Sequence, residues 1–181
     1  ITTINTDGTV SYMTKDEARA AGITKSPYEF EERTSLSYDG DYYPSSGSTE
    51  NNPSIKGPSC AWYVSGRINE IYDKLGINKR WNYCGNGDEW YSYALENEIP
   101  CSNDISKPRA GAAASFGTST GKRHVIFIEA VNDDGTVNIS EANAGTGNTA
   151  GFRYSENVTI ERLKTWCNQN FIGYVYTLPE E

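Results

Sequence analysis

The residues between 124 and 143 constrain the fold more than any other stretch, because they form two strand-like runs around a tight turn. Residues 124–131 and 136–143 are rich in β-branched and apolar side chains, and the linking residues 132–135 end in Asp-Gly, a pair typical of hairpin turns. Two strands joined in this way pair antiparallel. The chain is therefore predicted to contain an antiparallel sheet.

A helix is predicted to begin at Cys60. Apolar side chains recur from there at helical spacing, at Val64, Ile68, Ile71 and Leu75. Ser59 is a favoured N-cap, and Gly76 stands where a glycine commonly ends a helix. A thiol in the first turn lies at the positive end of the helix dipole, which lowers its pKa and favours the nucleophilic thiolate. The alternative is that Cys60 is a small buried hydrophobic residue.

Shorter elements are predicted on both sides of the helix and hairpin. Residues 27–58 are rich in Ser, Asp, Tyr, Gly, Asn and Pro, and we expect a long loop or a strap across the domain surface. The other predicted elements are a short strand at the start, a helix from a capping box at 14–17 to Gly22, a helix over 89–97 with Trp90 and Ala94 on one face, a strand over 111–116, a helix from Thr159 to about Trp166, and a strand over 171–178.

Length and charge restrict the function. A chain of 181 residues suits one domain with a sizeable core, or a domain plus a short appendage, and 36% hydrophobic with 12% aromatic residues is typical of an α+β protein. The net charge of −8 argues against a nucleic acid partner, because phosphates require clustered Lys and Arg. No apolar run approaches membrane-spanning length, so no membrane partner is expected. Because the chain starts at Ile1 without a leader-like segment, we expect a mature or excised piece of a longer protein.

The cysteines do not form a metal-binding pattern. None of the four forms a Cys-x-x-Cys pair and the chain has one histidine, so no structural zinc site is expected at Cys60, Cys84, Cys101 and Cys167. With Cys60 set aside as a nucleophile, three thiols remain. The predicted disulfide joins Cys84 to Cys101.

His124 is the only candidate base for a cysteine nucleophile, because the chain has no other histidine. It stands at the start of a predicted strand. A four-residue turn that pairs Val131 with Thr136 fixes the register of the hairpin. In that register Asn143 lies opposite His124, and Glu141 lies diagonal to it, near enough for side-chain hydrogen bonds on one face.

These residues meet the requirements of a Cys-His pair whose imidazole is held by a third polar group. Cys60 would attack a carbonyl, and His124 would take the thiol proton and later protonate the leaving amine. Glu141 or Asn143 would fix the ring, and the backbone N–H of Cys60 is the predicted oxyanion donor. The alternative is a structural histidine beside polar surface residues.

Five segments resemble the CHAP domain, the cysteine, histidine-dependent amidohydrolase/peptidase. They follow one another in the order of that family and comprise residues 58–67 around Cys60, 85–90, 108–114, 123–131 around His124, and 140–143, which reads Ser-Glu-Ala-Asn. The resemblance spans about residues 54–178. The chain departs from the family at Arg123, where a small residue usually precedes the histidine, and at Ser59, where Asn or Gln usually precedes the cysteine.

The resemblance implies a papain-like α+β fold in which the nucleophile helix packs on an antiparallel sheet. It divides the chain into an N-terminal appendage with a polar loop (1–53) and a CHAP catalytic domain (54–181). It also implies cleavage of peptidoglycan, either at the N-acetylmuramoyl-L-alanine amide or within the stem peptide or cross-bridge. Members of the family are bacterial autolysins and remodelling enzymes, phage endolysins and virion-associated lysins, so we expect a secreted or cell-wall location, or a phage origin.

Two further expectations concern what the domain binds. Some family members bind calcium near the nucleophile; Asp39 and Asp41 are the candidate ligands here, with a solvated turn as the alternative, and no cofactor is expected to be required. An acidic surface repels anionic wall polymers, so we expect flanking cell-wall-binding or other modules, or a bound cation, to help the enzyme dock.

Four residues of the helices are candidates for contacts with substrate. Aromatic rings can stack on sugar or peptide, and an arginine can pair with a stem-peptide carboxylate, which singles out Trp62, Tyr63, Arg67 and Trp90. The alternatives are core packing for the tryptophans and a surface salt bridge for Arg67.

Two functions of other kinds compete with peptidoglycan hydrolysis. One is a wall-binding or virion structural module that keeps the fold without turnover. The other is a papain-like protease that acts on proteins. Loss of wall lysis in variants of Cys60 or His124 would argue against the first, and a casein assay beside a peptidoglycan assay separates the second.

Overall fold

The fold is described from a computed structural model. It describes residues 2–4, 10–12, 30–35, 41–43, 59–143 and 151–179. The predicted helix over 14–22 and most of the predicted loop over 27–58, including Asp39, lie outside the described residues. The strand-like start is confirmed as an antiparallel pair, β1 (Thr2–Ile4) with β2 (Val10–Tyr12).

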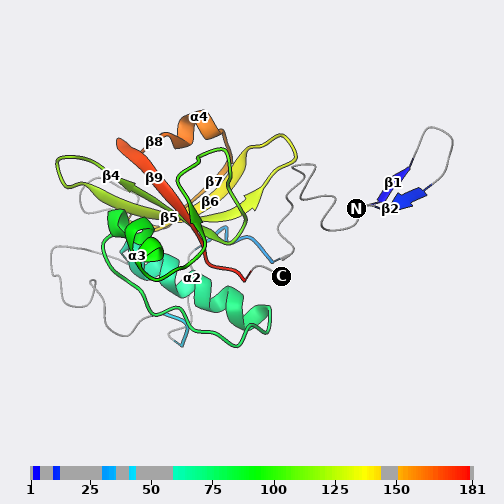
Figure 1. The fold of residues 1–181 in the computed structure, drawn as a ribbon, viewed down its shortest axis with the longest axis horizontal. Helices are drawn as coiled ribbons and strands as arrows, with labels where there is room; N and C mark the ends of the chain where they lie inside the picture. Colours follow the sequence, from blue (N-terminus) through cyan, green and yellow to red (C-terminus); the bar gives the residue numbers. More distant parts are fainter. Residues whose placement is uncertain are drawn as a thin grey trace.

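The body of the molecule is an antiparallel sheet covered on both faces (Figure 1). Its strands run in the order β3-β9-β4-β5-β6-β7. β8 also pairs with β9, at the start of β9 and on the edge that faces away from β4. Their bounds are β3 Cys101–Ser102, β4 Ala112–Gly117, β5 Arg123–Val131, β6 Val137–Glu141, β7 Arg153–Val158, β8 Thr165–Trp166 and β9 Gln169–Tyr176.

Helices cover the two faces of the sheet. α2 (Cys60–Lys74) and α3 (Trp90–Glu96), with the 3-10 turn η1 (Gly87–Glu89) before α3, lie on one face, and α4 (Ile160–Leu163) lies on the other (Figure 1). The predicted α+β architecture, with the Cys60 helix packed against an antiparallel sheet, is confirmed.

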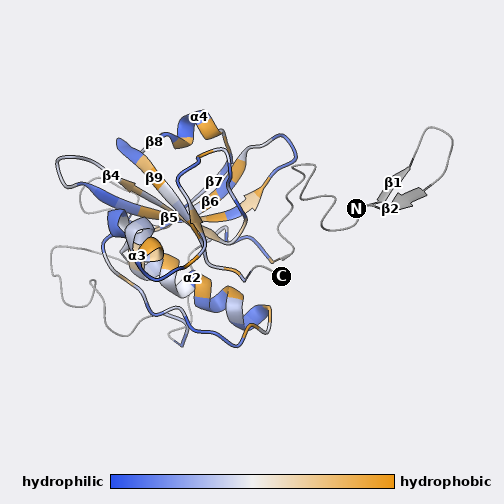
Figure 2. Cartoon of the chain, viewed as in Figure 1, coloured by the Kyte–Doolittle hydropathy of each residue, from blue (hydrophilic) through white to orange (hydrophobic). Residues whose placement is uncertain are grey.

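The period of two along the strands divides the core into two clusters. On β5, Val125 and Phe127 pack in the cluster beneath α2 and α3, while Ile126 and Ile128 pack in the cluster on the opposite face. Hydrophobic residues concentrate in the sheet and along α2 and α3, whereas the loops are mostly hydrophilic (Figure 2). Burial on both faces explains why β5 reads as a nearly continuous apolar run.

α2 begins and ends where the sequence predicts. The Ser59 hydroxyl accepts a hydrogen bond from the backbone N–H of Trp62, and Gly76 follows the helix with a φ of +65°. Unlike an ordinary surface helix, α2 is buried on almost every side through its first three turns. Gly66 shows how close the covering is, because a Cβ there would lie 1.9–2.4 Å from ring atoms of Tyr43.

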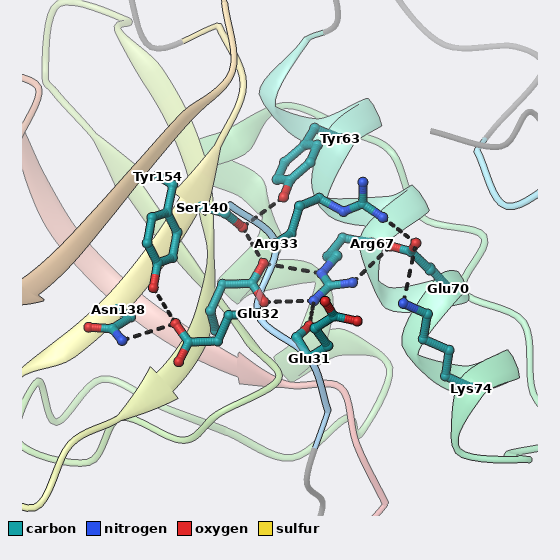
Figure 3. Close-up of polar contacts among 11 residues, drawn as sticks. Glu31, Glu32, Arg33, Tyr63, Arg67, Glu70, Lys74, Asn138, Ser140 and Tyr154 are labelled. Carbon is teal, nitrogen blue, oxygen red and sulfur yellow. Dashed lines mark hydrogen bonds and ion pairs between the residues drawn. The ribbon is translucent and has the colours of Figure 1, made fainter. Parts of the chain in front are cut away.

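The upstream segments 30–35 and 41–43 supply that covering. The backbone carbonyl of Glu31 accepts from Arg67, and Glu32 accepts from Tyr154 and Asn138 (Figure 3). The Phe30 ring lies 6.1 Å from that of Phe127. The boundary between residues 53 and 54 stays a prediction. Through these contacts residues 30–35 and 41–43 pack as part of the same body as α2 and the sheet.

The structure corrects three local predictions. α4 ends at Leu163 and Trp166 lies in β8, because the chain turns back to pair with β9. The sequence analysis did not predict β7, which pairs with β6. The predicted disulfide is wrong, since Cys84 and Cys101 are both free thiols.

Across the described part of the chain, no helix combines the length and apolar character needed to cross a membrane.

Candidate active site

Cys60 is the first residue of α2 and is buried, with 8% of its surface exposed. Its side chain hydrogen-bonds that of His124, and the backbone N–H groups of Ala61 and Val125 also interact with its sulfur. Burial raises the pKa of the Cys60 thiol, but the hydrogen bond and positive charge of His124 outweigh burial, so the pKa lies below its ordinary value. The helix N-terminus adds to this effect.

His124 lies near the start of β5, close to the N-terminus of α2, and is also buried. Its Nε2 lies 2.5 Å from Oε2 of Glu141, which leaves Nδ1 for the thiol of Cys60. Burial lowers the pKa of His124, but the hydrogen bonds and charges of Cys60 and Glu141 raise it to about 10. The two shifts favour a thiolate beside an imidazolium as the resting form of the pair.

The loop before α3 packs against the backbone of His124. Gly87 packs so closely that a Cβ would lie 2.4–2.8 Å from backbone atoms of His124. The Ser115 hydroxyl donates to the carbonyl of Gly87 at 2.6 Å and fixes this contact. The Gly-Asn-Gly-Asp turn is therefore part of the site through its backbone.

Glu141 ends β6 and its side chain is fully buried. It accepts hydrogen bonds from His124, from Arg153 Nε at 2.8 Å and from Trp166 Nε1 at 3.1 Å. Burial raises the pKa of Glu141, but the hydrogen bonds and charges of His124 and Arg153 hold it below its ordinary value. A carboxylate in these surroundings stays ionised and holds the imidazole ring.

The register that brings Glu141 to His124 arises from two deviations that cancel. Val131 pairs with Val137 and not with Thr136 as predicted, a shift of one residue. A β-bulge between Ile128 and Ala130 then shifts the register back, so that Ile128 pairs with Ile139 in the predicted register. Glu141 therefore lies diagonal to His124, as the sequence analysis predicts.

Asn143 lies beyond the end of β6, with a φ of +58°. Asparagine tolerates this left-handed conformation better than most residues. In the described structure the His124 ring hydrogen-bonds the carboxylate of Glu141, and no such bond to Asn143 is found. A catalytic role for Asn143 stays a prediction.

Comparison with known proteins assigns the family. The family model for the CHAP domain matches residues 49–143, which is more than half of the chain and includes Cys60, His124 and Glu141. The chain belongs to the CHAP domain family.

Relatives of this CHAP domain include proteins named staphylococcal secretory antigens. Staphylococcal secretory antigen ssaA2 of Staphylococcus aureus strains MRSA252 and NCTC 8325 is 31% identical over 105 residues, which are 57% of this chain and 34% of the relative. The chain thus spans about a third of the length of these relatives.

Two solved structures are more distantly similar. An N-acetylmuramoyl-L-alanine amidase from Staphylococcus aureus is 20% identical, with a TM-score of 0.47 over 90% of this chain and 40% of that one. Ly7917 with the hydrolyzing product of MDP is also 20% identical, with a TM-score of 0.44 over 68% of this chain and 55% of that one.

Three of the four predicted substrate contacts are wrong for this CHAP domain. Tyr63 and Trp90 have no exposed surface, and Arg67 has 1%. Tyr63 donates to the hydroxyl of Ser140 at 2.7 Å, Trp90 stacks on Trp81 in the core, and Arg67 forms a buried ion pair with Glu129. Side chains buried in this way cannot line a substrate groove. Trp62 is partly exposed and stays a predicted contact.

Three groups of polar residues could bear on charge or metal binding near the site. Arg123 is exposed, and its Nε lies 3.5 Å from Oδ1 of Asp88. His124, Glu141 and Cys167 offer ligand atoms within 4.8 Å of one another, but the Arg153 guanidinium already donates to both Glu141 and Cys167, so we assign no metal to them. The proposed calcium ligands stay a prediction, because Asp39 lies outside the described residues.

The sequence analysis missed Arg153, Trp166 and Cys167. All three lie beyond the segment that matches the family model: Arg153 is on β7, Trp166 is on β8, and Cys167 is in the turn between β8 and β9. Recognition of the alternating run over 153–158 as a third strand would have placed Arg153 beside Glu141, since the two are Cα partners across β6 and β7.

The thiolate-imidazolium pair predicts a pH signature. Iodoacetamide should alkylate Cys60 at a pH below the ordinary pKa of cysteine, and before Cys84 and Cys101, because burial raises the pKa of both those thiols. Replacing His124 with alanine removes the partner that lowers the Cys60 pKa and leaves burial unopposed. The alkylation midpoint should then move to higher pH, as peptide mapping by mass spectrometry would measure. An unchanged midpoint would contradict the assignment of His124.

Proposed function

We propose that this CHAP domain is a peptidoglycan hydrolase that cleaves an amide bond by cysteine nucleophilic catalysis. The observation that carries the proposal is the buried chain of contacts from Cys60 through His124 to Glu141, at the N-terminus of α2. This is the arrangement that acyl transfer by a thiol requires, with a nucleophile, a base and a group that orients the base. Membership of the CHAP domain family supports peptidoglycan as the substrate.

The chain's residues would act in two half-reactions. In the first, the Cys60 thiolate attacks the amide carbonyl carbon, and the His124 imidazolium gives its proton to the leaving nitrogen as the C–N bond breaks. In the second, His124 takes a proton from water, and the hydroxide formed attacks the thioester and releases Cys60. Glu141 keeps the ring oriented in both steps, because its carboxylate is held by Arg153 and Trp166.

The oxyanion formed in each step needs a donor. The backbone N–H of Cys60 lies at the N-terminus of a fifteen-residue helix, where the amide dipoles favour negative charge. We propose this group as the oxyanion donor, and Trp62, one residue after Ala61 on the same turn, as a contact for the substrate. Asn143 and calcium bound by Asp39 and Asp41 remain proposed additions to the site.

Location and partners follow from the same proposal. We infer that the protein acts outside the cell, on the bacterial wall or as a phage lysin, which agrees with the name secretory antigen given to its relatives. Because the chain spans about a third of those relatives, we propose flanking cell-wall-binding modules in the full-length protein.

The deciding experiment is digestion of purified peptidoglycan by the chain of residues 1–181. Walls with different cross-bridges should release soluble fragments, and mass spectrometry of the new N-termini should identify one amide. A free alanine N-terminus at the start of the stem peptide would mean amidase activity, and an N-terminus within the stem or cross-bridge would mean endopeptidase activity. Casein, digested in parallel, should stay intact.

The two competing functions give different results in that experiment. Binding to walls without new N-termini would favour a wall-binding or virion structural module. Degradation of casein at a rate comparable to that of peptidoglycan would favour a general protease. Either outcome would overturn the proposed hydrolase.

A further inference from the structure

Glu141 is held by more than the histidine it orients. Arg153 donates to its Oε1 through Nε at 2.8 Å and through Nη2 at 2.6 Å, while Trp166 Nε1 lies 3.1 and 3.2 Å from the two carboxylate oxygens. With His124 on Oε2, the carboxylate has donors on both oxygens. The geometry leaves Glu141 one orientation, which is the one that contacts the imidazole.

Charge explains why one of these donors is an arginine. A thiolate at Cys60, an imidazolium at His124 and a carboxylate at Glu141 sum to one negative charge in a buried site. Burial of an uncompensated charge is strongly unfavourable, and the carboxylate would take up a proton to avoid it. Arg153 supplies the balancing positive charge, so the charges alternate along the chain of four residues.

Arg153 is itself fixed in place. It faces Glu141 across neighbouring strands, its guanidinium lies over the Trp166 ring at 5.2 Å, and its Nη2 donates to the Cys167 sulfur at 3.1 Å. With 42% of the side chain exposed, it reaches the buried carboxylate from the rim of the site. Arg153 therefore supplies a positive charge to the buried carboxylate while its own side chain stays partly in solvent.

We propose that Arg153 is a positioning residue, which keeps Glu141 ionised and aimed at His124 during catalysis. The inference rests on the proposed function, because the step it assists is proton transfer by His124. It is distinct from that function, because it assigns a role to a strand outside the segment matched by the CHAP family model.

The test compares two arginines that share one tryptophan. Arg162 also lies over the Trp166 ring, at 5.1 Å, but is not among the donors to Glu141 in the described structure. Replacing Arg153 with methionine should lower kcat on a soluble peptidoglycan fragment by about 10- to 100-fold with KM little changed, the range typical of lost supporting hydrogen bonds around a catalytic group. Arg162→Met should stay within about twofold of wild type, and Arg153→Lys should recover part of the loss.

A double-mutant cycle shows whether Arg153 acts through Glu141. In a Glu141→Gln background there is no carboxylate to hold, so Arg153→Met should have almost no further effect. The acid limb of the pH profile should also move to higher pH in Arg153→Met. Among the described residues, the charged or titratable groups around Glu141 are His124, Arg153 and Cys167, and removing one positive neighbour raises the pKa of the carboxyl.

Alkylation separates failure of this inference from failure of the proposed function. Arg153→Met should slow the reaction of Cys60 with iodoacetamide, below the ordinary thiol pKa, by about tenfold, and this reaction needs no peptidoglycan. Equal kcat and alkylation rates for Arg153→Met and Arg162→Met would overturn the proposal. The proposal would also be overturned if Arg153→Met lowered kcat equally in the wild-type and Glu141→Gln backgrounds, or if it raised KM and left kcat unchanged. Should Arg153→Met fail to fold, Arg153→Lys takes its place in the same comparisons.

Discussion

Replacing Cys60 with alanine is expected to abolish peptidoglycan hydrolysis while leaving the fold intact. Removal of a catalytic nucleophile lowers kcat by about four orders of magnitude or more, because no other group can form the covalent intermediate. The sulfur is a single buried atom at the start of α2, so its loss should hardly change the stability of the helix. Release of wall fragments and a thermal melt would measure the two effects.

Cys84→Ala is the matched control for this variant. Cys84 is another partly buried thiol packed against the same core cluster, and it is also free. It should retain near wild-type hydrolysis, since burial raises the pKa of its thiol and its hydrogen-bond partner is Ser65 and not His124. If Cys60→Ala kept a tenth of wild-type activity, the assignment of Cys60 as nucleophile would be wrong.

Replacing Arg67 with methionine is expected to destabilise the protein by about 3–5 kcal/mol, the usual effect of breaking a buried ion pair by removing one partner. Arg67 donates to Glu129 through Nε at 3.1 Å and Nη2 at 2.8 Å, and to Glu70 through Nη1 at 2.8 Å (Figure 3). Its Nη2 also donates to the carbonyl of Glu31 at 2.6 Å. Methionine fills similar space but leaves the Glu129 carboxylate buried without its cation.

Urea denaturation would measure this loss, and Lys74→Met is its control. Lys74 stands on the same helix and lies 3.8 Å from Glu70, but its side chain is 46% exposed. An exposed pair of this kind contributes about 1 kcal/mol or less. A difference in unfolding free energy below about 1 kcal/mol between the two variants would show that Arg67 is not the centre of a buried network.

The same network explains why the sequence-based prediction for Arg67 is wrong. The pattern of α2 predicts its apolar face, and a residue off that face is expected to meet solvent or substrate. Here the polar side of α2 is covered by residues 30–35 and 41–43, which come from a region with no periodic pattern of its own. Local periodicity does not report what a distant segment covers.

The bulge in β5 illustrates a second limit. Glu129 lies at the bulge and its carboxylate accepts from Arg67 and from the Ser140 hydroxyl at 2.5 Å. The hairpin turn predicts the pairing at Val131 incorrectly by one residue, and the bulge restores it before Glu141. The predicted register is therefore wrong between the turn and Glu129 and correct between Glu129 and His124. The neighbours predicted for His124 lie in the correct part.

The elements that could be predicted correctly are those with local signals. The N-cap at Ser59, the spacing of apolar residues to Leu75, the Asp-Gly turn and the single histidine were enough to place a thiol at a helix start and an imidazole on a strand. Which group orients the imidazole, and which charge balances that group, could be learned only from the arrangement of the strands. Those choices depend on how β6 pairs with β5 and β7, and strand pairing brings together residues whose separation along the chain carries no periodic signal.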